Sequence, residues 1–268
     1  MTLLVLGPEG TFSHELAIRA FAEEILILPT IHEIFSQVEQ GAGDGLVPIE
    51  NSEAGGVGPT LDGLLLHRVF VTAELYMPVH HNLAGFTPVP DITVLYAHPQ
   101  THEQCSRIVN ALKVPVIHTS SNAASAHKLA QSPRGAAAIV SRMTADLYKV
   151  PILRENVENN PGNTTRFIRI SRTRGSDEGC TKCSILVDPE KDQPGLLYQI
   201  LGIFAERDIN LTRIESRPSK RSMGEYLFFI DLACSPACRG ALAALSEKSR
   251  FRELGCYNEL EVPVCTSR

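Results

Sequence analysis

LLVLGPEGTFS, residues 3–13, decides how the chain begins to fold. Residues 3–7 are a short apolar run that predicts a buried strand, and the Gly-Pro-Glu-Gly that follows is typical of a turn. We expect a helix to begin at about Ser13 and to end at about Glu24. A buried strand that leads through a turn into a helix is the repeating unit of a parallel α/β sheet.

The same alternation continues over the first part of the chain. Apolar runs predict further strands, and amphipathic runs predict helices between them. The predicted strands cover 44–50, 69–75, 92–98, 114–120 and 136–141, and the predicted helices cover 31–40, 59–67, 100–112 and 121–131. Strands that alternate with helices indicate the α/β fold class with a mainly parallel sheet.

Ligands of such sheets bind beyond the carboxyl ends of the strands. Five segments there are rich in hydroxyl, amide and glycine residues: GPEGTFS (7–13), IENS (49–52), AHPQ (97–100), TSSNAA (119–124) and TTRF (164–167). Two of them open predicted helices, where unpaired backbone N–H groups and a partial positive charge suit carboxylates. Ser and Thr residues there are also ordinary helix caps, so both interpretations stay open.

The pattern changes after RTRGSDEG (172–179), a charged and glycine-bearing stretch that predicts a linker. Beyond it the predicted order is strand, helix, strand, strand, helix, strand. The expected bounds of these elements are 183–189, 195–208, 209–217, 224–233, 237–248 and 251–262. This is the ferredoxin-like βαββαβ order, so a second domain is predicted at 180–268.

The composition is that of a soluble globular protein, with 43% hydrophobic and 21% charged residues. The net charge of −5, the absence of Trp and the lack of basic clusters interleaved with aromatic residues argue against a nucleic-acid partner. The first apolar run is too short for a signal peptide or a membrane span. We therefore expect a cytoplasmic protein with no membrane partner.

Six of the seven cysteines fall after residue 179, and an odd count argues against a disulfide framework as the basis of the fold. In the ferredoxin-like order the first and third strands are antiparallel neighbours. Cys180 and Cys183 can then meet Cys234 and Cys238, with Cys265 able to approach them. Four thiolates are enough for tetrahedral zinc. We expect scattered reduced thiols and no metal, while metal binding or disulfide pairing of this group stays open.

Taken in order, the motifs resemble those of the prephenate dehydratase family with a C-terminal ACT regulatory domain. The resemblance is carried by GPEGTFS (7–13), VPIENS (47–52), TLDGLL (60–65), HPQTHEQC (98–105), TSSNAA (119–124), NTTRF (163–167), GLLYQIL (195–201), INLTRIESRP (209–218) and GEYLFFID (224–231). Together they cover almost the whole chain in the family's order. One position departs from it, because the family commonly has Ser before HPQ and this chain has Ala97. Since the first predicted strand starts at Leu3, we expect no chorismate mutase domain.

The resemblance implies a two-lobed catalytic domain at 1–175, similar to the type 2 periplasmic-binding-protein fold, and an ACT domain at 180–268. Lobe one would comprise 1–77 and 155–172, and lobe two 78–154, with a cleft between them. The implied reaction is the decarboxylating dehydration of prephenate to phenylpyruvate, water and CO2 in L-phenylalanine biosynthesis. The family uses no metal or organic cofactor, so none is expected.

The resemblance also implies the residues of the site. Thr165 is the family's catalytic hydroxyl and would donate a hydrogen bond to the departing oxygen, while Arg166 would clamp a substrate carboxylate. Glu50 or a water would supply the proton, although Glu50 can instead simply pair with Arg166. The remaining predictions are Asn51 and Gln104 as catalytic orienting groups, and Thr11, Ser13, Ser52, Ser121, Asn122 and Phe167 as substrate contacts.

In the family, L-Phe binds at the interface between two ACT domains. The resemblance implies effector contacts from Gly195, Leu196, Asn210, Leu211, Glu215, Ser216 and Arg217. Such a shared site implies a homodimer or homotetramer whose activity is feedback-regulated by L-Phe through a shift between conformations. Two alternatives stay open. One is an arogenate dehydratase, and the other is a non-catalytic cytoplasmic amino-acid-binding sensor with the same fold.

Overall fold

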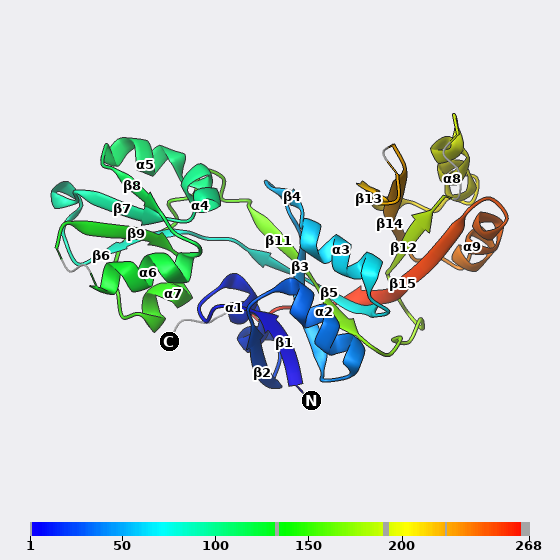
Figure 1. The fold of residues 1–268 in the computed structure, drawn as a ribbon, viewed down its shortest axis with the longest axis horizontal. Helices are drawn as coiled ribbons and strands as arrows, with labels where there is room; N and C mark the ends of the chain where they lie inside the picture. Colours follow the sequence, from blue (N-terminus) through cyan, green and yellow to red (C-terminus); the bar gives the residue numbers. More distant parts are fainter. Residues whose placement is uncertain (1, 132–133, 190–192, 223, 264–268) are drawn as a thin grey trace.

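The computed structural model describes residues 2–131, 134–189, 193–222 and 224–263. The molecule is elongated, and lobe two, lobe one and the C-terminal domain follow one another along its long axis (Figure 1). Within these described residues, no helix combines the length and the apolar character needed to cross a bilayer.

Lobe one is built on five strands of one sheet, in the order β5-β11-β3-β1-β2. Its elements are β1 (Thr2–Leu6), α1 (Phe12–Ala20), β2 (Glu24–Leu28), α2 (Ile31–Gln40), β3 (Asp44–Asn51), β4 (Gly55–Gly56), α3 (Gly58–Leu66), β5 (Phe70–Pro78) and β11 (Thr164–Ser171). β1 pairs in parallel with β2 and β3, whereas β11 is antiparallel to β3 and β5. The chain therefore leaves lobe one after β5 and returns to it as β11.

The start of lobe one differs from the prediction in one element. The expected helix to about Glu24 ends at Ala20, and EILIL at 24–28 forms β2, which pairs in parallel with β1. The β-branched Ile25 and Ile27 favour extended backbone, and their apolar side chains let this short segment add a strand at the edge of the sheet. The next helix, α2, agrees with the prediction and is capped by Gly41.

Lobe two is a separate five-stranded sheet in the order β10-β6-β9-β7-β8. Its elements are β6 (Asn82–Gly85), the 3₁₀ helix η1 (Val89–Asp91), β7 (Val94–Ala97), α4 (Pro99–Gln104), α5 (Ser106–Leu112), β8 (Val116–His118), α6 (Asn122–Gln131), β9 (Ala136–Val140), α7 (Arg142–Leu147) and β10 (Ile152–Arg154). The single helix predicted at 100–112 is two helices that meet at Cys105. Cys105 packs in the core, and its burial raises the pKa of the thiol to about 12.

Two extended segments join the lobes. One leads from β5 to β6 and the other from β10 to β11, and they lie side by side. The backbone N–H of Val79 donates to the Asn163 carbonyl at 2.8 Å, and that of Val157 donates to the His81 carbonyl at 2.8 Å. The two-lobed α/β architecture expected from the sequence is confirmed (Figure 1).

The C-terminal domain has the predicted βαββαβ order. Its elements are β12 (Lys182–Asp188), α8 (Leu196–Ala205), β13 (Leu211–Pro218), β14 (Tyr226–Ala233), α9 (Cys238–Ser246) and β15 (Arg250–Glu259). The strands pair antiparallel in the order β13-β14-β12-β15. Both helices cover one face of this sheet (Figure 1), and the core between them includes Ile185, Ile200 and Leu245.

The end of β15 joins the C-terminal domain to lobe one. Asn258 and Glu259 pair in parallel with Ala73 and Glu74 of β5, so the two sheets become one ten-stranded sheet. The face of the C-terminal sheet that its helices leave open contributes Leu186, Phe229 and Leu254 to the core of lobe one. The sequence pattern did not predict this continuity, because it arises from pairing between strands far apart in the chain.

A buried ion cluster lies at this junction. Arg166 of β11 donates from Nε to Glu74 at 2.7 Å, from Nη1 to Asp231 at 2.6 Å and from Nη2 to the Tyr257 hydroxyl at 3.0 Å. Lys182 adds an ion pair to Glu74 at 2.6 Å. Burial alone would lower the pKa of Arg166, but Asp231, Tyr257 and Glu74 outweigh it and raise that pKa. A charged guanidinium therefore ties β5 and β11 of lobe one to β14 and β15.

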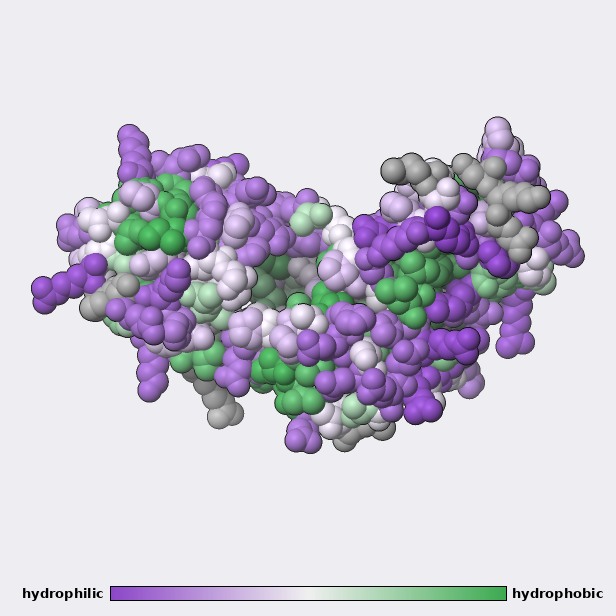
Figure 2. All heavy atoms as spheres, viewed as in Figure 1, coloured by the Kyte–Doolittle hydropathy of each residue, from purple (hydrophilic) through white to green (hydrophobic). Residues whose placement is uncertain are grey.

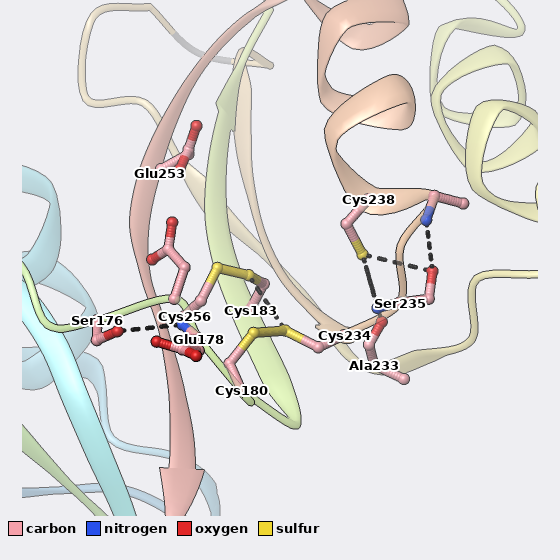
Figure 3. Close-up of a disulfide and its surroundings, with 12 residues drawn as sticks. Ser176, Glu178, Cys180, Cys183, Ala233, Cys234, Ser235, Cys238, Glu253 and Cys256 are labelled. Atoms are coloured by element: carbon pink, nitrogen blue, oxygen red, sulfur yellow. Dashed lines mark hydrogen bonds between the residues drawn. A yellow bond between two sulfur atoms is a disulfide. The ribbon is translucent and has the colours of Figure 1, made fainter.

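The C-terminal domain also contains two disulfides, which join Cys180 to Cys234 and Cys183 to Cys256 (Figure 3). The expectation of scattered reduced thiols is therefore wrong for these four residues. The group predicted from the sequence contained Cys238 in place of Cys256. That prediction rested on the pairing of the first and third strands alone. β15 also pairs with β12, and this pairing sets Cys256 opposite Cys183. Cys265 lies outside the described residues.

We expect Arg166→Ala to lower the free energy of unfolding by about 3–5 kcal/mol, because it leaves the buried Asp231 carboxylate without its counter-charge. Urea unfolding followed by circular dichroism measures the change. The matched control is Arg142→Ala, since Arg142 and Glu155 form a pair in which both side chains are more than half exposed and which contributes about 0–1 kcal/mol. Equal losses for the two variants would show that the buried cluster does not hold the junction.

Candidate functional site

A cavity of about 390 Å³ lies between the two lobes. Figure 2 shows the surface hollowed between lobe two and lobe one. Each of the five segments selected from the sequence contributes to its lining. The cavity brings together Thr11, Ser13, Asn51, Gln104, Ser121, Asn122, Thr165 and Phe167.

The side chain of Asn51 holds the Thr165 hydroxyl in place. Asn51 Nδ2 lies 2.9 Å from Thr165 Oγ1 and 2.7 Å from Asn163 Oδ1. The backbone N–H groups of Glu53 and Ala54 donate to Asn51 Oδ1, so the hydrogen-bond network fixes the orientation of the amide. Because Thr165 Oγ1 accepts a hydrogen bond from Asn51, its own proton is available for donation into the cavity.

Helix N-termini converge on the same cavity. α1 begins after Thr11, α4 begins after His98, and α6 begins at Asn122. The side chains of Thr11 and Ser121 each accept a backbone hydrogen bond in the first turn of their helix, so they are caps as well as cavity residues. The aligned peptide dipoles give these helix ends a partial positive charge that attracts anions.

The lining carries little charge of its own. Among the described residues that line the cavity there is no Arg, Lys, Asp or Glu. Its titratable side chains are His81 and His98, and burial lowers the pKa of both. Both imidazoles are therefore neutral at about pH 7. The electrostatic attraction for an anionic ligand has to come from the helix N-termini and from neutral hydrogen-bond donors.

His81, which follows His80 on the segment between β5 and β6, is a cavity residue that the sequence analysis did not predict. Its side chain is buried, with the ring edge-on to Phe12 at a centroid distance of 5.7 Å and Nε2 3.1 Å from Gln104 Oε1. Its Nδ1 is buried and has no hydrogen-bond partner among the described residues. His80 instead pairs with Glu158. The sequence feature that could have identified His81 is its position, next to His80, on a segment that crosses between the lobes.

The structure does not place Arg166 in the cavity, so its predicted role as a carboxylate clamp is wrong. Successive side chains of a strand point to opposite faces. Since Thr165 and Phe167 of β11 face the cavity, Arg166 between them faces the other way, into the ion cluster at the domain junction. Thr165 and Arg166 are adjacent in sequence, and on a strand this adjacency places their side chains on opposite faces rather than in one site.

Glu50 and Ser52 also lie outside the cavity lining. Glu50 sits beside Asn51 on β3 and faces the C-terminal domain, where its Oε2 lies 3.2 Å from Arg213 Nε and 3.8 Å from Arg166 Nη1. This position favours the alternative that Glu50 is a pairing partner, and it does not place the carboxylate where it can supply a proton in the cavity. Ser52 Oγ accepts from the backbone N–H of Thr164 and fixes the turn that precedes Thr165.

The residues predicted to contact the effector lie on the C-terminal domain, on α8 and β13. Gly195 precedes α8 with a φ of 83°, a left-handed conformation that favours glycine, and Leu196 begins the helix. Asn210 precedes β13, which contains Leu211, Glu215, Ser216 and Arg217. β13 also reaches lobe one, because Arg217 Nη2 lies 3.4 Å from an Asp62 carboxylate oxygen of α3.

A family model described as prephenate dehydratase matches residues 3–175, and a model described as ACT domain matches residues 190–246. The chain belongs to the prephenate dehydratase family. The bifunctional chorismate mutase/prephenate dehydratase of Pseudomonas aeruginosa is 38% identical over 263 residues, which span 94% of this chain and 72% of that protein. The prephenate dehydratase of Methanocaldococcus jannaschii is 39% identical over 234 residues, which span 84% of this chain and 85% of that protein.

A solved structure agrees with these relatives. The crystal structure of prephenate dehydratase in complex with L-Phe from Arthrobacter aurescens superimposes with a TM-score of 0.88 at 30% identity, covering 98% of this chain and 92% of that chain. The resemblance inferred from the sequence is therefore confirmed, and the chain is an enzyme of this family with a C-terminal ACT domain.

We expect Glu50→Gln to change kcat by less than about threefold, a difference of under 1 kcal/mol in the barrier, because this carboxylate faces Arg213 rather than the cavity. Initial rates with prephenate and no effector measure it. Asn51→Ala is the contrasting variant, since it removes the donor that holds Thr165, and it should lower kcat far more. A fall of about a hundredfold for Glu50→Gln would mean that the carboxylate acts in the reaction.

Proposed function

We propose that this protein catalyses the decarboxylating dehydration of prephenate to phenylpyruvate, water and CO2 in L-phenylalanine biosynthesis, with residues 1–175 as the catalytic domain and 180–268 as the ACT domain. The observation that carries the proposal is the Thr165 hydroxyl, fixed by Asn51, in a cavity where helices begin. The reaction is expected to need no cofactor, and the cytoplasm is its expected compartment.

The cavity suits the chemistry of prephenate. The substrate carries two carboxylates, loses one as CO2 and its ring hydroxyl as water, and takes up one proton, so that the ring becomes aromatic. The N-termini of α1 and α6 are suited to hold a carboxylate. Ile31, Val57 and Phe167 give part of the cavity an apolar wall. A carboxylate that leaves water for such a wall is less well solvated, which favours its departure as CO2.

Thr165 contributes a hydrogen bond to the departing ring hydroxyl. An alcohol is too weak an acid to transfer its proton fully, but a fixed donor aimed at a leaving oxygen stabilises the charge that develops there. The neutral imidazoles of His81 and His98 are weak proton sources at about pH 7, and Glu50 faces away from the cavity. We therefore assign the proton that completes the water molecule to solvent that enters the cavity.

The lining favours prephenate over arogenate. Arogenate carries an ammonium group where prephenate carries a keto oxygen, and a buried ammonium needs a carboxylate partner. The described lining residues include no Asp or Glu. Amide donors such as that of Gln104 suit a keto oxygen instead.

Incubation of the purified protein with prephenate, with phenylpyruvate followed by its absorbance, tests the activity directly. Arogenate is assayed in parallel, with phenylalanine as the expected product. Turnover of prephenate supports the proposal, and a preference for arogenate would correct the substrate. Binding of either compound without turnover would favour the alternative of a sensor on the same fold.

Regulation by L-Phe has a direct structural route to the cavity. The predicted effector strand β13 carries Arg213, which pairs with Glu50 of β3, and Glu50 precedes the Asn51 that holds Thr165. Glu215 packs against Gly56 of β4 so closely that a side chain there would overlap its carboxylate. We propose that L-Phe binds between ACT domains of two copies in a homodimer or homotetramer and that a shift of β13 is transmitted through these contacts.

Thr165→Val removes the hydroxyl at nearly constant volume. We expect it to lower kcat by about 10²–10³-fold, the usual cost of losing one donor to developing charge, and to change KM much less. Thr165→Ser keeps the hydroxyl and should retain most of the activity. Steady-state rates with prephenate measure both variants, and a near-normal kcat for Thr165→Val would remove Thr165 from the mechanism.

Arg213→Ala breaks the contact between β13 and Glu50. We expect the L-Phe concentration for half-inhibition to rise at least about fivefold, the low end of allosteric coupling energies, with kcat in the absence of L-Phe nearly unchanged. Arg221→Ala is the control, because Arg221 pairs with Asp188 and Glu225 inside the C-terminal domain. Inhibition that is unchanged in Arg213→Ala, while calorimetry still detects L-Phe binding, would exclude this route.

A further inference from the structure

Four cysteine sulfurs gather in the C-terminal domain, away from the cavity between the lobes. The Sγ atoms of Cys180, Cys183, Cys234 and Cys256 all lie within 4.8 Å of one another, joined as two disulfides (Figure 3). We propose that in the reduced protein these four sulfurs form a binding site for one soft divalent cation, Zn²⁺. The inference does not depend on the proposed function, since none of these residues lines the cavity between the lobes.

The spacing of the sulfurs is close to that of a tetrahedral thiolate site. Zinc–sulfur bonds of about 2.3 Å place the sulfurs of such a site about 3.8 Å apart. The Sγ atoms of Cys183 and Cys234, which belong to different disulfides, are already 3.6 Å apart. When the two disulfides open, the bonded sulfurs need to separate by little more than a side-chain rotation to surround a common centre.

The backbone holds the four cysteines together independently of how their sulfurs are paired. Thr181 lies within the C-x2-C segment, and its N–H donates to the carbonyl of Tyr257 at 3.2 Å while its carbonyl accepts from the N–H of Cys234 at 2.9 Å. The pairing of β12 with β15 sets Cys183 opposite Cys256. Reduction therefore leaves the side chains converged, which is the preorganisation that a metal site needs.

The ligand pattern is that of a zinc site. A C-x2-C segment with two further cysteines from neighbouring strands supplies the four thiolates of a closed structural zinc site. The Cα atoms of Cys183 and Cys256 are 4.1 Å apart, below the usual range of about 4.4–6.8 Å for disulfides, whereas those of Cys180 and Cys234 are 6.1 Å apart and within it. Thiolates select zinc over magnesium or calcium, which prefer oxygen ligands.

A metal can reach the sulfurs from solvent. A cavity of about 610 Å³ opens beside them, and Cys180 and Cys234 are only partly buried. Arg239 also lines this cavity, whereas Arg174 there is paired with Asp177 and Glu253. Four thiolates around one Zn²⁺ carry a net charge of about −2, which the Arg239 guanidinium partly offsets.

The metal site forms in two steps, reduction of the disulfides and then coordination of the metal, and each step balances in electrons and protons. Each disulfide first takes up two electrons and two protons from a dithiol or phosphine reductant, which is oxidised, and the pair of disulfides gives four thiols. Zn²⁺ then displaces up to four protons as the sulfurs coordinate as thiolates. Metal affinity should therefore fall as the pH is lowered.

The cysteine site lies next to the connections between the C-terminal domain and lobe one, so a bound metal would affect the stability of the whole chain. The linker from the catalytic domain ends at Cys180, and Cys256 lies directly before Tyr257, whose hydroxyl accepts from Arg166 in the ion cluster at the junction. β15 then continues to its pairing with β5. A bound metal would brace both connections between the C-terminal domain and lobe one, so it should raise the melting temperature of the whole chain.

The test uses the full chain reduced with a phosphine under nitrogen, loaded with Zn²⁺ and desalted. Mass spectrometry of the metal should find about one equivalent per chain. Loading with Co²⁺ should give the intense visible bands and sulfur-to-metal charge transfer of a tetrahedral thiolate site. Cys180→Ser and Cys256→Ser should lose the metal and the rise in melting temperature that it causes.

Cys238→Ser is the matched control, because the Cys238 sulfur is turned toward Ser235 and Ala233 and away from the disulfides (Figure 3). This variant should still bind one equivalent. Less than about a tenth of an equivalent in the fully reduced native chain would overturn the proposal, and so would metal retained by Cys256→Ser but lost by Cys238→Ser. If the serine variants at the cluster unfold, the cobalt spectrum of the native chain decides the question.

Discussion

The alternation of side chains along β11 is the constraint on which the rest of the molecule depends. One strand must present Thr165 to the cavity and Arg166 to the domain junction, because neighbouring residues of a strand point to opposite faces. The hydroxyl is held by Asn51 of β3, and the guanidinium is held by carboxylates of β5 and β14. The chemistry and the attachment of the C-terminal domain are thus built on adjacent residues.

This arrangement leaves the cavity without a cationic side chain among its described lining residues. A cationic side chain placed there would hold a carboxylate firmly, but it would also stabilise the carboxylate that has to leave as CO2. Helix N-termini and neutral donors bind an anion more weakly and cost no reorganisation during the reaction. We infer that aromatisation provides the driving force and that the protein mainly orients the substrate, with Asn51 and Gln104 as fixed polar groups.

Much of the fold could be predicted from local pattern. The strand and helix order of the C-terminal domain and the loops that line the cavity follow from apolar periodicity and from the position of hydroxyl-rich segments after strands. The continuity of β15 with β5 could not be predicted, because it is a pairing between residues more than a hundred positions apart. Arg166 was misplaced for a different reason, since a motif read as one unit hides the strand alternation that separates its members.

The alternation of side chains along a strand also connects the C-terminal domain to the cavity. β3 repeats the division seen in β11, with Asn51 facing the cavity and Glu50 facing Arg213 of β13. Under the proposed function, a displacement of the C-terminal sheet would act on two strands whose opposite faces carry the Thr165 hydroxyl and the Asn51 that holds it. Because packed cores resist small deformations, we infer that movement on one face is carried to the other. The cysteine cluster lies beside the junction, where the linker and β15 connect the C-terminal domain to lobe one, so its chemical state bears on how firmly the sheet is held.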